Sequence, residues 1–155
     1  GLAIFGYPLT GEVEEDGRTV QYFERARFEL HPDAWPERFD VLLTRLGADM
    51  VAERIARGEQ PFRPVQAGSD DFCNFYPETG HRLCGAFREY WEAHGGLAIF
   101  GFPLSEEFDE RNPDTGEVYT VQYFERARFE WHPGDGERPG LVLLGRLGAQ
   151  ALAER

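Results

Sequence analysis

Apolar and polar residues alternate most regularly in the segment QYFERARFE, which occurs at positions 21–29 and again at 122–130. Aromatic and β-branched residues at every second position are typical of strands that bury one face. We therefore expect each segment to form a β-hairpin with an aromatic face.

The turn of this hairpin sets the register of the two strands. In the second segment, a two-residue turn at Arg126 and Ala127 places Glu125 opposite Arg128, and further along the strands it places Phe124 opposite Phe129 and Gln122 opposite Trp131. Tight hairpin turns favour Asn or Gly over Arg-Ala, so a longer loop is the alternative.

A different period precedes the second copy of the segment, over Leu83–His94. Its apolar residues have the spacing of one helical face: Leu83, Phe87, Tyr90 and Trp91. We expect a helix here, with Thr79 as its N-cap and Gly95 and Gly96 ending it. A shorter helix is expected after each hairpin, with the face Leu42, Leu46, Met50 and Val51 in the first case and with Gly47 weakening its middle.

Three blocks of sequence are duplicated. They are identical at 8 of 10, 13 of 14 and 10 of 14 positions, respectively: 1–10 with 96–105, 19–32 with 120–133, and 41–54 with 142–155. The offset grows from 95 to 101 because six additional residues lie in a loop of the second copy that contains Asn112, Pro113, Asp114 and Gly116. Such repetition predicts two units with the same fold.

The repeats define the predicted domains. Residues 1–57 form the first module, 58–71 a Pro- and Gly-containing linker, and 72–155 the second module, which alone has a leading segment Cys73–Gly95. The predicted fold class is α+β: a tandem repeat of small modules, each with a helix, a Gly-Pro turn segment, a β-hairpin and a short helix. The first module lacks its helical segment.

Charge excludes some classes of partner. The 28 acidic and 16 basic residues give a net charge of −12, and every cation is Arg. Such a chain repels phosphate, so nucleic acid is not expected as a partner. No apolar run has the roughly 20 residues needed to cross a bilayer, so membrane insertion is not expected either. Because Gly1 is not an initiator, we expect either a removed signal segment or an internal fragment.

Two cysteines, Cys73 and Cys84, flank the segment NFYPETGHRL. A structural zinc site needs four ligands, and the cysteines with His81 supply three, so a disulfide is favoured, with buried free thiols as the alternative. Such a bond contributes about 3 kcal/mol and implies an oxidising setting, hence an extracellular or cell-surface location.

The candidate catalytic groups lie within the duplicated blocks and therefore occur twice. His31 and His132 recur at one position without a serine or cysteine nucleophile beside them, and the carboxylate pairs Glu24–Glu29 and Glu125–Glu130 are interleaved with arginines. We expect no catalytic residues, no metal site and no cofactor, and hence no enzyme.

Aromatic residues make up 14% of the chain, and four of them have two interpretations. A platform for stacking sugars or contacting a partner protein would use Tyr22, Tyr123, Trp131 and Trp91. The same spacing is also typical of core residues.

The second module resembles the LGFP-type repeats of bacterial cell-envelope and secreted proteins. The residues that carry this resemblance are Trp91, Gly95, Gly96, Gly101, Phe102, Pro103, Phe124, Phe129, Trp131 and Pro133, with Gly6, Tyr7, Pro8, Phe23, Phe28 and Pro32 in the first copy. The chain is also similar to the FYPETGH and VQYFERARFE modules of secreted proteins of filamentous phototrophic and related thermophilic bacteria. It departs from Leu-Gly-Phe-Pro in having Phe5-Gly6-Tyr7-Pro8 and Phe100-Gly101-Phe102-Pro103.

The resemblance implies an envelope-anchoring or binding module. Together with the repeats, it predicts a non-catalytic extracellular protein, structural or adhesive, that binds itself or neighbouring repeats and assembles head to tail into a filament. The alternative is a cell-wall or polysaccharide-binding module of a secreted hydrolase, with a cell-wall glycan as its partner.

Overall fold

A computed structural model describes residues 1–32 and 41–155. Residues 33–40, which belong to the first predicted module, lie outside the described residues. Within the described part, the chain is mixed α+β, with five α-helices, a short 3₁₀ helix and three antiparallel sheets. The predicted α+β class is confirmed.

Two of the sheets have four strands each. The first sheet has its strands in the order β1 (Val13–Glu15), β2 (Arg18–Tyr22), β3 (Arg27–Leu30) and β4 (Val41–Leu43). The second sheet follows the order β7 (Phe108–Arg111), β8 (Val118–Tyr123), β9 (Arg128–His132) and β10 (Leu141–Leu144). The predicted hairpins are β2–β3 and β8–β9, and sequence reasoning missed the strand that flanks each of them on either side.

The predicted register of the second hairpin is wrong by two residues. Tyr123 pairs with Arg128 and Gln122 with Phe129, and the turn is closed by the Phe124 N–H, which donates to the Ala127 carbonyl over 2.8 Å. A shift of two keeps every side chain on its predicted face, so Phe124 and Phe129 still meet, with ring centroids 4.2 Å apart.

The predicted helix at Leu83–His94 begins later than expected. The chain first forms a two-stranded sheet, β5 (Cys73–Tyr76) with β6 (His81–Cys84), and α3 then runs over Gly85–Ala93. The apolar face is confirmed for Phe87 and Trp91, which are buried on α3, whereas Leu83 is buried on β6 and not on the helix. Thr79 is not the N-cap; its hydroxyl donates to the Pro103 carbonyl over 2.6 Å.

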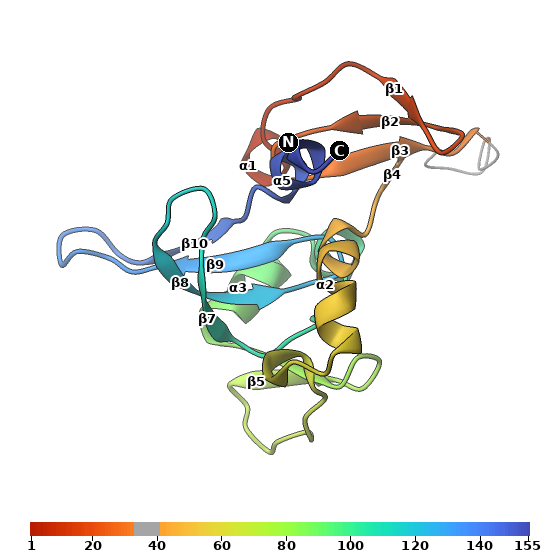
Figure 1. The fold of residues 1–155 in the computed structure, drawn as a ribbon. Helices are drawn as coiled ribbons and strands as arrows, with labels where there is room; N and C mark the ends of the chain where they lie inside the picture. Colours follow the sequence, from red (N-terminus) through yellow and green to blue (C-terminus); the bar gives the residue numbers. More distant parts are fainter. Residues whose placement is uncertain (33–40) are drawn as a thin grey trace.

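The two helices that follow the four-stranded sheets are exchanged between them. α2 (Leu46–Ala56) follows the first sheet but lies beside the second, and α5 (Leu147–Ala153) follows the second sheet but lies beside the first (Figure 1). Leu42, expected on the first of these helices, belongs instead to β4.

The start of α2 contacts the turn of the second hairpin. The Ala48 N–H donates to the Glu125 carbonyl over 2.9 Å, and the Arg45 guanidinium lies 2.6 Å from the Glu125 carboxylate. A Cβ on Gly47 would lie only 1.9 Å from the Phe124 carbonyl oxygen. Gly47 is therefore a contact residue that lets the two backbones approach.

The start of α5 makes the same contacts with the turn of the first hairpin. The Ala149 N–H donates to the Glu24 carbonyl over 3.0 Å, and Arg146 lies 3.7 Å from the Glu24 carboxylate. A Cβ on Gly148 would lie 1.8 Å from the Phe23 carbonyl oxygen.

Each turn glutamate also holds the Gly-aromatic-Pro segment that follows α1 (Leu2–Phe5) or α4 (Gly96–Phe100). The Phe102 N–H donates to the Glu125 carboxylate over 2.8 Å, and the Glu125 N–H donates to the Phe102 carbonyl. Gly101 has a φ of 77°, and a Cβ there would lie 2.6 Å from the Cβ of Glu125. The glycine is required both by its backbone conformation and by this contact.

Two apolar cores lie on opposite faces of the second sheet. One core joins α3 and α4 to Phe124, Phe129 and Leu144. The other joins Val51 of α2 to Val121, Tyr123, Leu104 and Phe62. Phe62 lies in the 3₁₀ helix η2 (Gln60–Phe62), so the segment expected to be an exposed connection contributes a residue that is 4% exposed.

Replacing Gly47 with Ala tests the helix–turn contact. Ala is favoured over Gly in a helix by about 1 kcal/mol, so an undocked helix would be stabilised. If the helix is docked, the substitution should instead lower the free energy of unfolding by roughly 1–3 kcal/mol, because the added methyl group meets backbone atoms. Urea unfolding measures it, with Gly11→Ala as a control because its Cβ meets nothing within 4 Å. A stabilised Gly47→Ala protein would contradict the contact.

Candidate functional site

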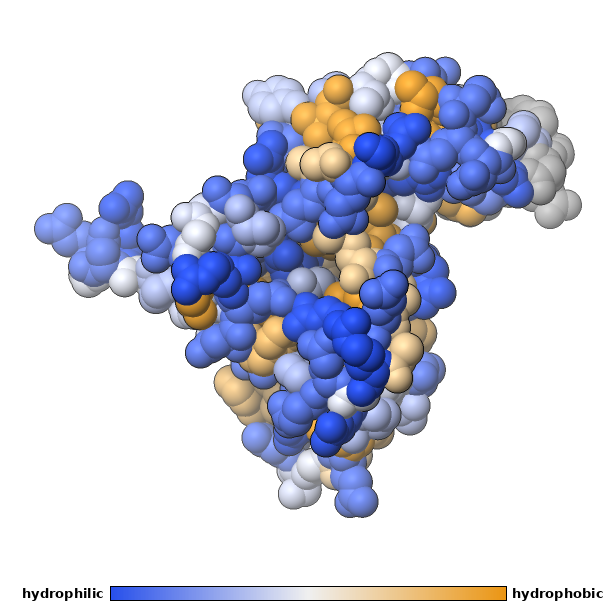
Figure 2. Space-filling view, in the orientation of Figure 1, coloured by the Kyte–Doolittle hydropathy of each residue, from blue (hydrophilic) through white to orange (hydrophobic). Residues whose placement is uncertain are grey.

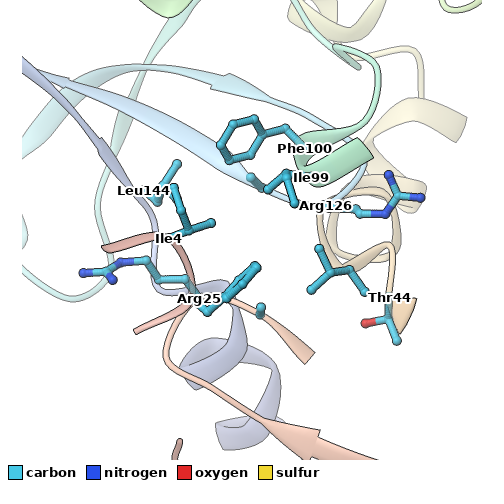
Figure 3. Close-up of a pocket in the computed structure, with 11 residues that line it drawn as sticks. Ile4, Arg25, Thr44, Ile99, Phe100, Arg126 and Leu144 are labelled. Carbon is cyan, nitrogen blue, oxygen red and sulfur yellow. The ribbon is translucent and has the colours of Figure 1, made fainter. Parts of the chain in front are cut away.

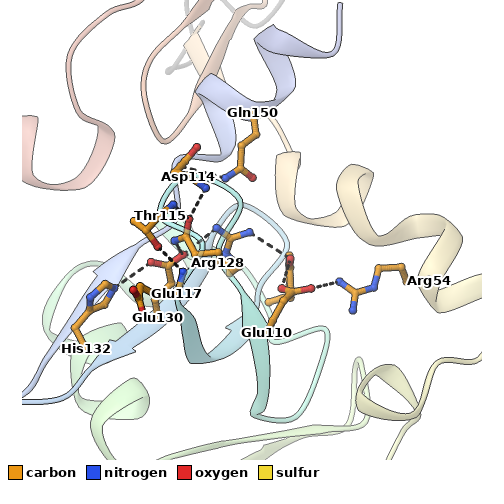
Figure 4. Close-up of polar contacts among 11 residues, drawn as sticks. Arg54, Glu110, Asp114, Thr115, Glu117, Arg128, Glu130, His132 and Gln150 are labelled. Atoms are coloured by element: carbon orange, nitrogen blue, oxygen red, sulfur yellow. Dashed lines mark hydrogen bonds and ion pairs between the residues drawn. The ribbon is translucent and has the colours of Figure 1, made fainter.

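The largest group of interacting charged side chains lies on the face of the second sheet that α2 covers (Figure 4). Arg128 and Glu130, adjacent on that face of β9, are each 3% exposed and lie 2.9 Å apart. Glu110 of β7 accepts hydrogen bonds from the Tyr123 hydroxyl over 2.7 Å and from Arg54 of α2 over 2.6 Å. Burial raises the pKa of Tyr123, which keeps its hydroxyl a donor.

A loop closes this cluster. Asn112 is 8% exposed, and its amide donates to the Glu130 carboxylate over 2.9 Å. Its side-chain oxygen accepts from the backbone N–H groups of Asp114 and Thr115. The six additional residues of the second copy thus provide a lid for a buried ion pair.

The corresponding residues of the first sheet form the same cluster without the lid. Arg27 donates to Glu29 over 2.9 Å, the Tyr22 hydroxyl donates to Glu15, and Arg155, just beyond the end of α5, lies 3.5 Å from Glu15. β1 and β2 are joined here by a tight turn at Asp16 and Gly17, both with positive φ. No residue corresponds to Asn112.

The cluster of the first sheet therefore lines an open cavity of about 510 Å³. Asp49 and Met50 of α2 and Glu154 near the end of α5 complete its wall. The cavity contains both signs of charge, and two of its acidic groups, Glu15 and Glu29, are each within 4 Å of an arginine.

The four aromatic residues predicted as a binding face are not brought together on the surface. Tyr22, Tyr123 and Trp91 are 3%, 4% and 9% exposed, because two pack under the exchanged helices and Trp91 packs into the α3 core. The Trp91 indole N–H donates to the Gly101 carbonyl over 3.0 Å. The expectation of an exposed face is wrong for these three, and their core interpretation holds.

Trp131 is the exception, since it is partly exposed. It lines a cavity of about 300 Å³ with Phe72, Glu107 and Thr120, and Phe72 is 63% exposed. Sequence reasoning missed Phe72, which has no counterpart in the first copy.

The predicted disulfide is present. Cys73 and Cys84 are bonded and are paired directly across β5 and β6. The bond closes the hairpin from which α3 begins.

Glu106, which lies just before β7, binds this hairpin to the second sheet. Its carboxylate lies 2.9 Å from the His81 Nδ1 and accepts hydrogen bonds from the Arg82 backbone N–H and guanidinium. Burial acts to raise the pKa of Glu106, but the bonds from His81 and Arg82 outweigh it, so the pKa lies below its usual value.

A third cavity lies where the two sheets meet (Figure 3). Ile4, Arg25 and Leu43 from the first copy face Ile99, Arg126 and Leu144, their counterparts in the second copy. Its volume of about 10 Å³ is near the minimum for one water molecule, so this is a packed junction.

The candidate catalytic groups are held by local contacts. His31 and His132 lie 2.9 and 3.1 Å from Glu29 and Glu130. Glu24 and Glu125, the other members of the predicted carboxylate pairs, bind the turn segments as described above. Within residues 1–32 and 41–155, no group of three or more His, Cys, Asp or Glu is placed to hold a metal ion.

Sequence reasoning missed Arg54 and Arg155, which complete the two clusters. Their signal was available, because both end the same duplicated block, VAER in one copy and LAER in the other.

Comparison of the chain with protein-family models, with curated proteins and with solved structures finds no match. None of the described helices is long and apolar enough to cross a membrane.

The lid over the second cluster predicts unequal effects of one substitution. Glu130→Gln leaves the Arg128 charge buried without its partner and should cost about 3–5 kcal/mol of unfolding free energy. The matched Glu29→Gln change, at a carboxylate 20% exposed, should cost about 1 kcal/mol or less. Denaturant unfolding of both variants checks this, and equal losses would contradict the role of Asn112.

The lowered pKa of Glu106 predicts a loss of stability in acid. The ionised form is favoured in the folded state, so its contribution is complete above the unfolded-state pKa of about 4.3 and disappears as the pH falls through the folded-state value. The stability difference between the wild type and Glu106→Gln should therefore shrink from pH 7 to about pH 3. A difference independent of pH would contradict it.

Proposed function

We propose that this chain is a non-catalytic extracellular repeat protein, structural or adhesive, whose two modules share one fold and act through contacts with neighbouring repeats. The observation that carries the proposal is the exchange of helices: α2 and α5 each dock on the sheet of the other copy through the same Gly-Ala pair. A fold whose units complete one another is typical of repeat proteins.

Two further observations support it. The carboxylates that could serve an enzyme are bound to arginines or backbone amides in both copies. The disulfide fits an oxidising compartment, and hence a secreted or cell-surface protein. Membership of the LGFP-like family, a bacterial and thermophilic source, and the module boundaries at 57 and 72 remain predictions.

The same contact supports the proposal of head-to-tail assembly. α2 docks on the copy that comes after it in the chain, whereas α5 docks back on the copy before it. If α5 docks instead on the first sheet of another molecule, the contact repeats from molecule to molecule and forms a filament.

Light scattering and electron microscopy of the native protein test this assembly. We expect multimers that lengthen with concentration and that Gly148→Ala prevents, because its methyl group blocks the α5 contact. Gly11→Ala, away from every contact, should leave them intact. A wild type that stays monomeric at every concentration would count against assembly.

A polysaccharide-binding module is the second candidate, and the cavity of Phe72 and Trp131 favours it. A largely exposed ring beside a partly exposed indole is suited to stacking on a sugar. Purified cell-wall polymers should retain the wild type and release Phe72→Ala, while Tyr7→Ala, at an exposed ring elsewhere, should still be retained. No retention of the wild type would exclude this candidate.

A further inference from the structure

The faces of the two four-stranded sheets that lie opposite α2 and α5 differ in how they are covered. On the second sheet, hairpin β5–β6 and helix α3 cover this face, and Phe129 at its centre is fully buried. On the first sheet, the corresponding Phe28 is partly exposed and lines a shallow cavity of about 160 Å³.

Corresponding residues along the edge of this face differ in the same direction. Phe102 packs on Tyr76 of β5, with ring centroids 5.9 Å apart, whereas its counterpart Tyr7 is 63% exposed. The first-copy residues are still apolar, as contact with a covering hairpin and helix requires. Orange, apolar atoms are visible among the blue in the part of the molecule that holds this sheet (Figure 2).

The polar groups that bind the cover are also retained. Gly101 and Pro103 accept hydrogen bonds from the cover through their carbonyls, from the Trp91 indole and the Thr79 hydroxyl. The corresponding carbonyls of Gly6 and Pro8 accept no hydrogen bond within the described part of the chain.

A glutamine side chain shows the same difference in hydrogen bonding between the two copies. Gln122 donates from its side-chain nitrogen to both the Ser105 and the Arg82 carbonyls. Gln21 donates to Thr10, the counterpart of Ser105, and lacks the second bond, which in the second copy goes to the cover.

We infer that this face of the first sheet binds a disulfide-closed β-hairpin followed by an aromatic-faced helix, of the same type as residues 73–93, supplied by polypeptide outside these 155 residues. The inference rests on the proposed repeat architecture and names the partner of the first module. The partner presents an indole N–H to the Gly6 carbonyl, a hydroxyl to the Pro8 carbonyl and aromatic rings to Phe28.

A second copy of this chain does not supply the occupant. Each chain has one such hairpin and helix, and these already cover its own second sheet. Donating them would expose one face to cover another, with no net gain in buried area.

One contact of the covered face has no counterpart. Glu106, which binds His81 and Arg82, corresponds to Gly11 in the first copy. A Cβ on Gly11 would meet nothing within 4 Å, so Gly11→Glu can restore the contact. This substitution should matter only when the face is occupied.

The test places a second copy of residues 57–95 directly before Gly1, which recreates the junction between Gly95 and Gly96. Docking should slow amide hydrogen exchange in β2 and β3 by about tenfold or more. The matched control carries Phe87→Ser and Trp91→Ser in the added copy only. Gly11→Glu should increase protection in the extended protein and leave the unextended protein unchanged.

Equal exchange rates in the extended protein and its control would overturn the inference, as would protection that appears in the unextended protein as its concentration rises. These results are independent of multimer formation and of retention on polymers. A positive docking result therefore remains valid even if the proposed assembly is not observed. If docking is not observed, the assembly proposal is still decided by light scattering and electron microscopy.

Discussion

The structure depends on one contact made twice, between the first turn of a helix and the turn of a hairpin in the other copy. The first N–H groups of a helix have no partner within the helix. Here the Ala48 and Ala149 N–H groups donate to the Glu125 and Glu24 carbonyls, and the adjacent glycines permit the approach. Because the same glutamates hold the Gly-aromatic-Pro segments, helix, hairpin and turn segment are joined at one residue in each copy.

This exchange explains why the two charge clusters have the same chemistry and different exposure. Each is built from a sheet of one copy and an arginine from the other, which is Arg54 of α2 or Arg155 just beyond α5. The additional residues of the second copy then cover Arg128 and Glu130, whereas the tight turn of the first copy leaves Arg27 and Glu29 beside an open cavity. The duplicated sequence blocks account for the residues that the two clusters share. The different lengths of the loops β1–β2 and β7–β8 account for their different exposure.

The sequence predicted the features that arise from local periodicity or direct repetition. The α+β class, the hairpins and the apolar face of α3 are of this kind, and the Cys73–Cys84 bond was predicted from the pair of cysteines alone. It did not predict which copy each helix would pack on, because identical blocks carry the same contact residues for either choice. The sequence left Tyr22 and Tyr123 with both a core and a binding interpretation for that reason, since the helices that bury them come from the other copy. The register failed because the backbone of Phe102 binds Glu125 and sets the turn there, a contact between segments more than 20 residues apart.

Amide hydrogen exchange of Ala48 and Ala149, measured by NMR, tests the helix–turn contact most directly. In a helix that ended in solvent, these first-turn amides would exchange at nearly the rate of an unfolded chain. Docking predicts that both exchange as slowly as the central amides of β2 and β8, through global unfolding. Rapid exchange at either alanine would contradict the account.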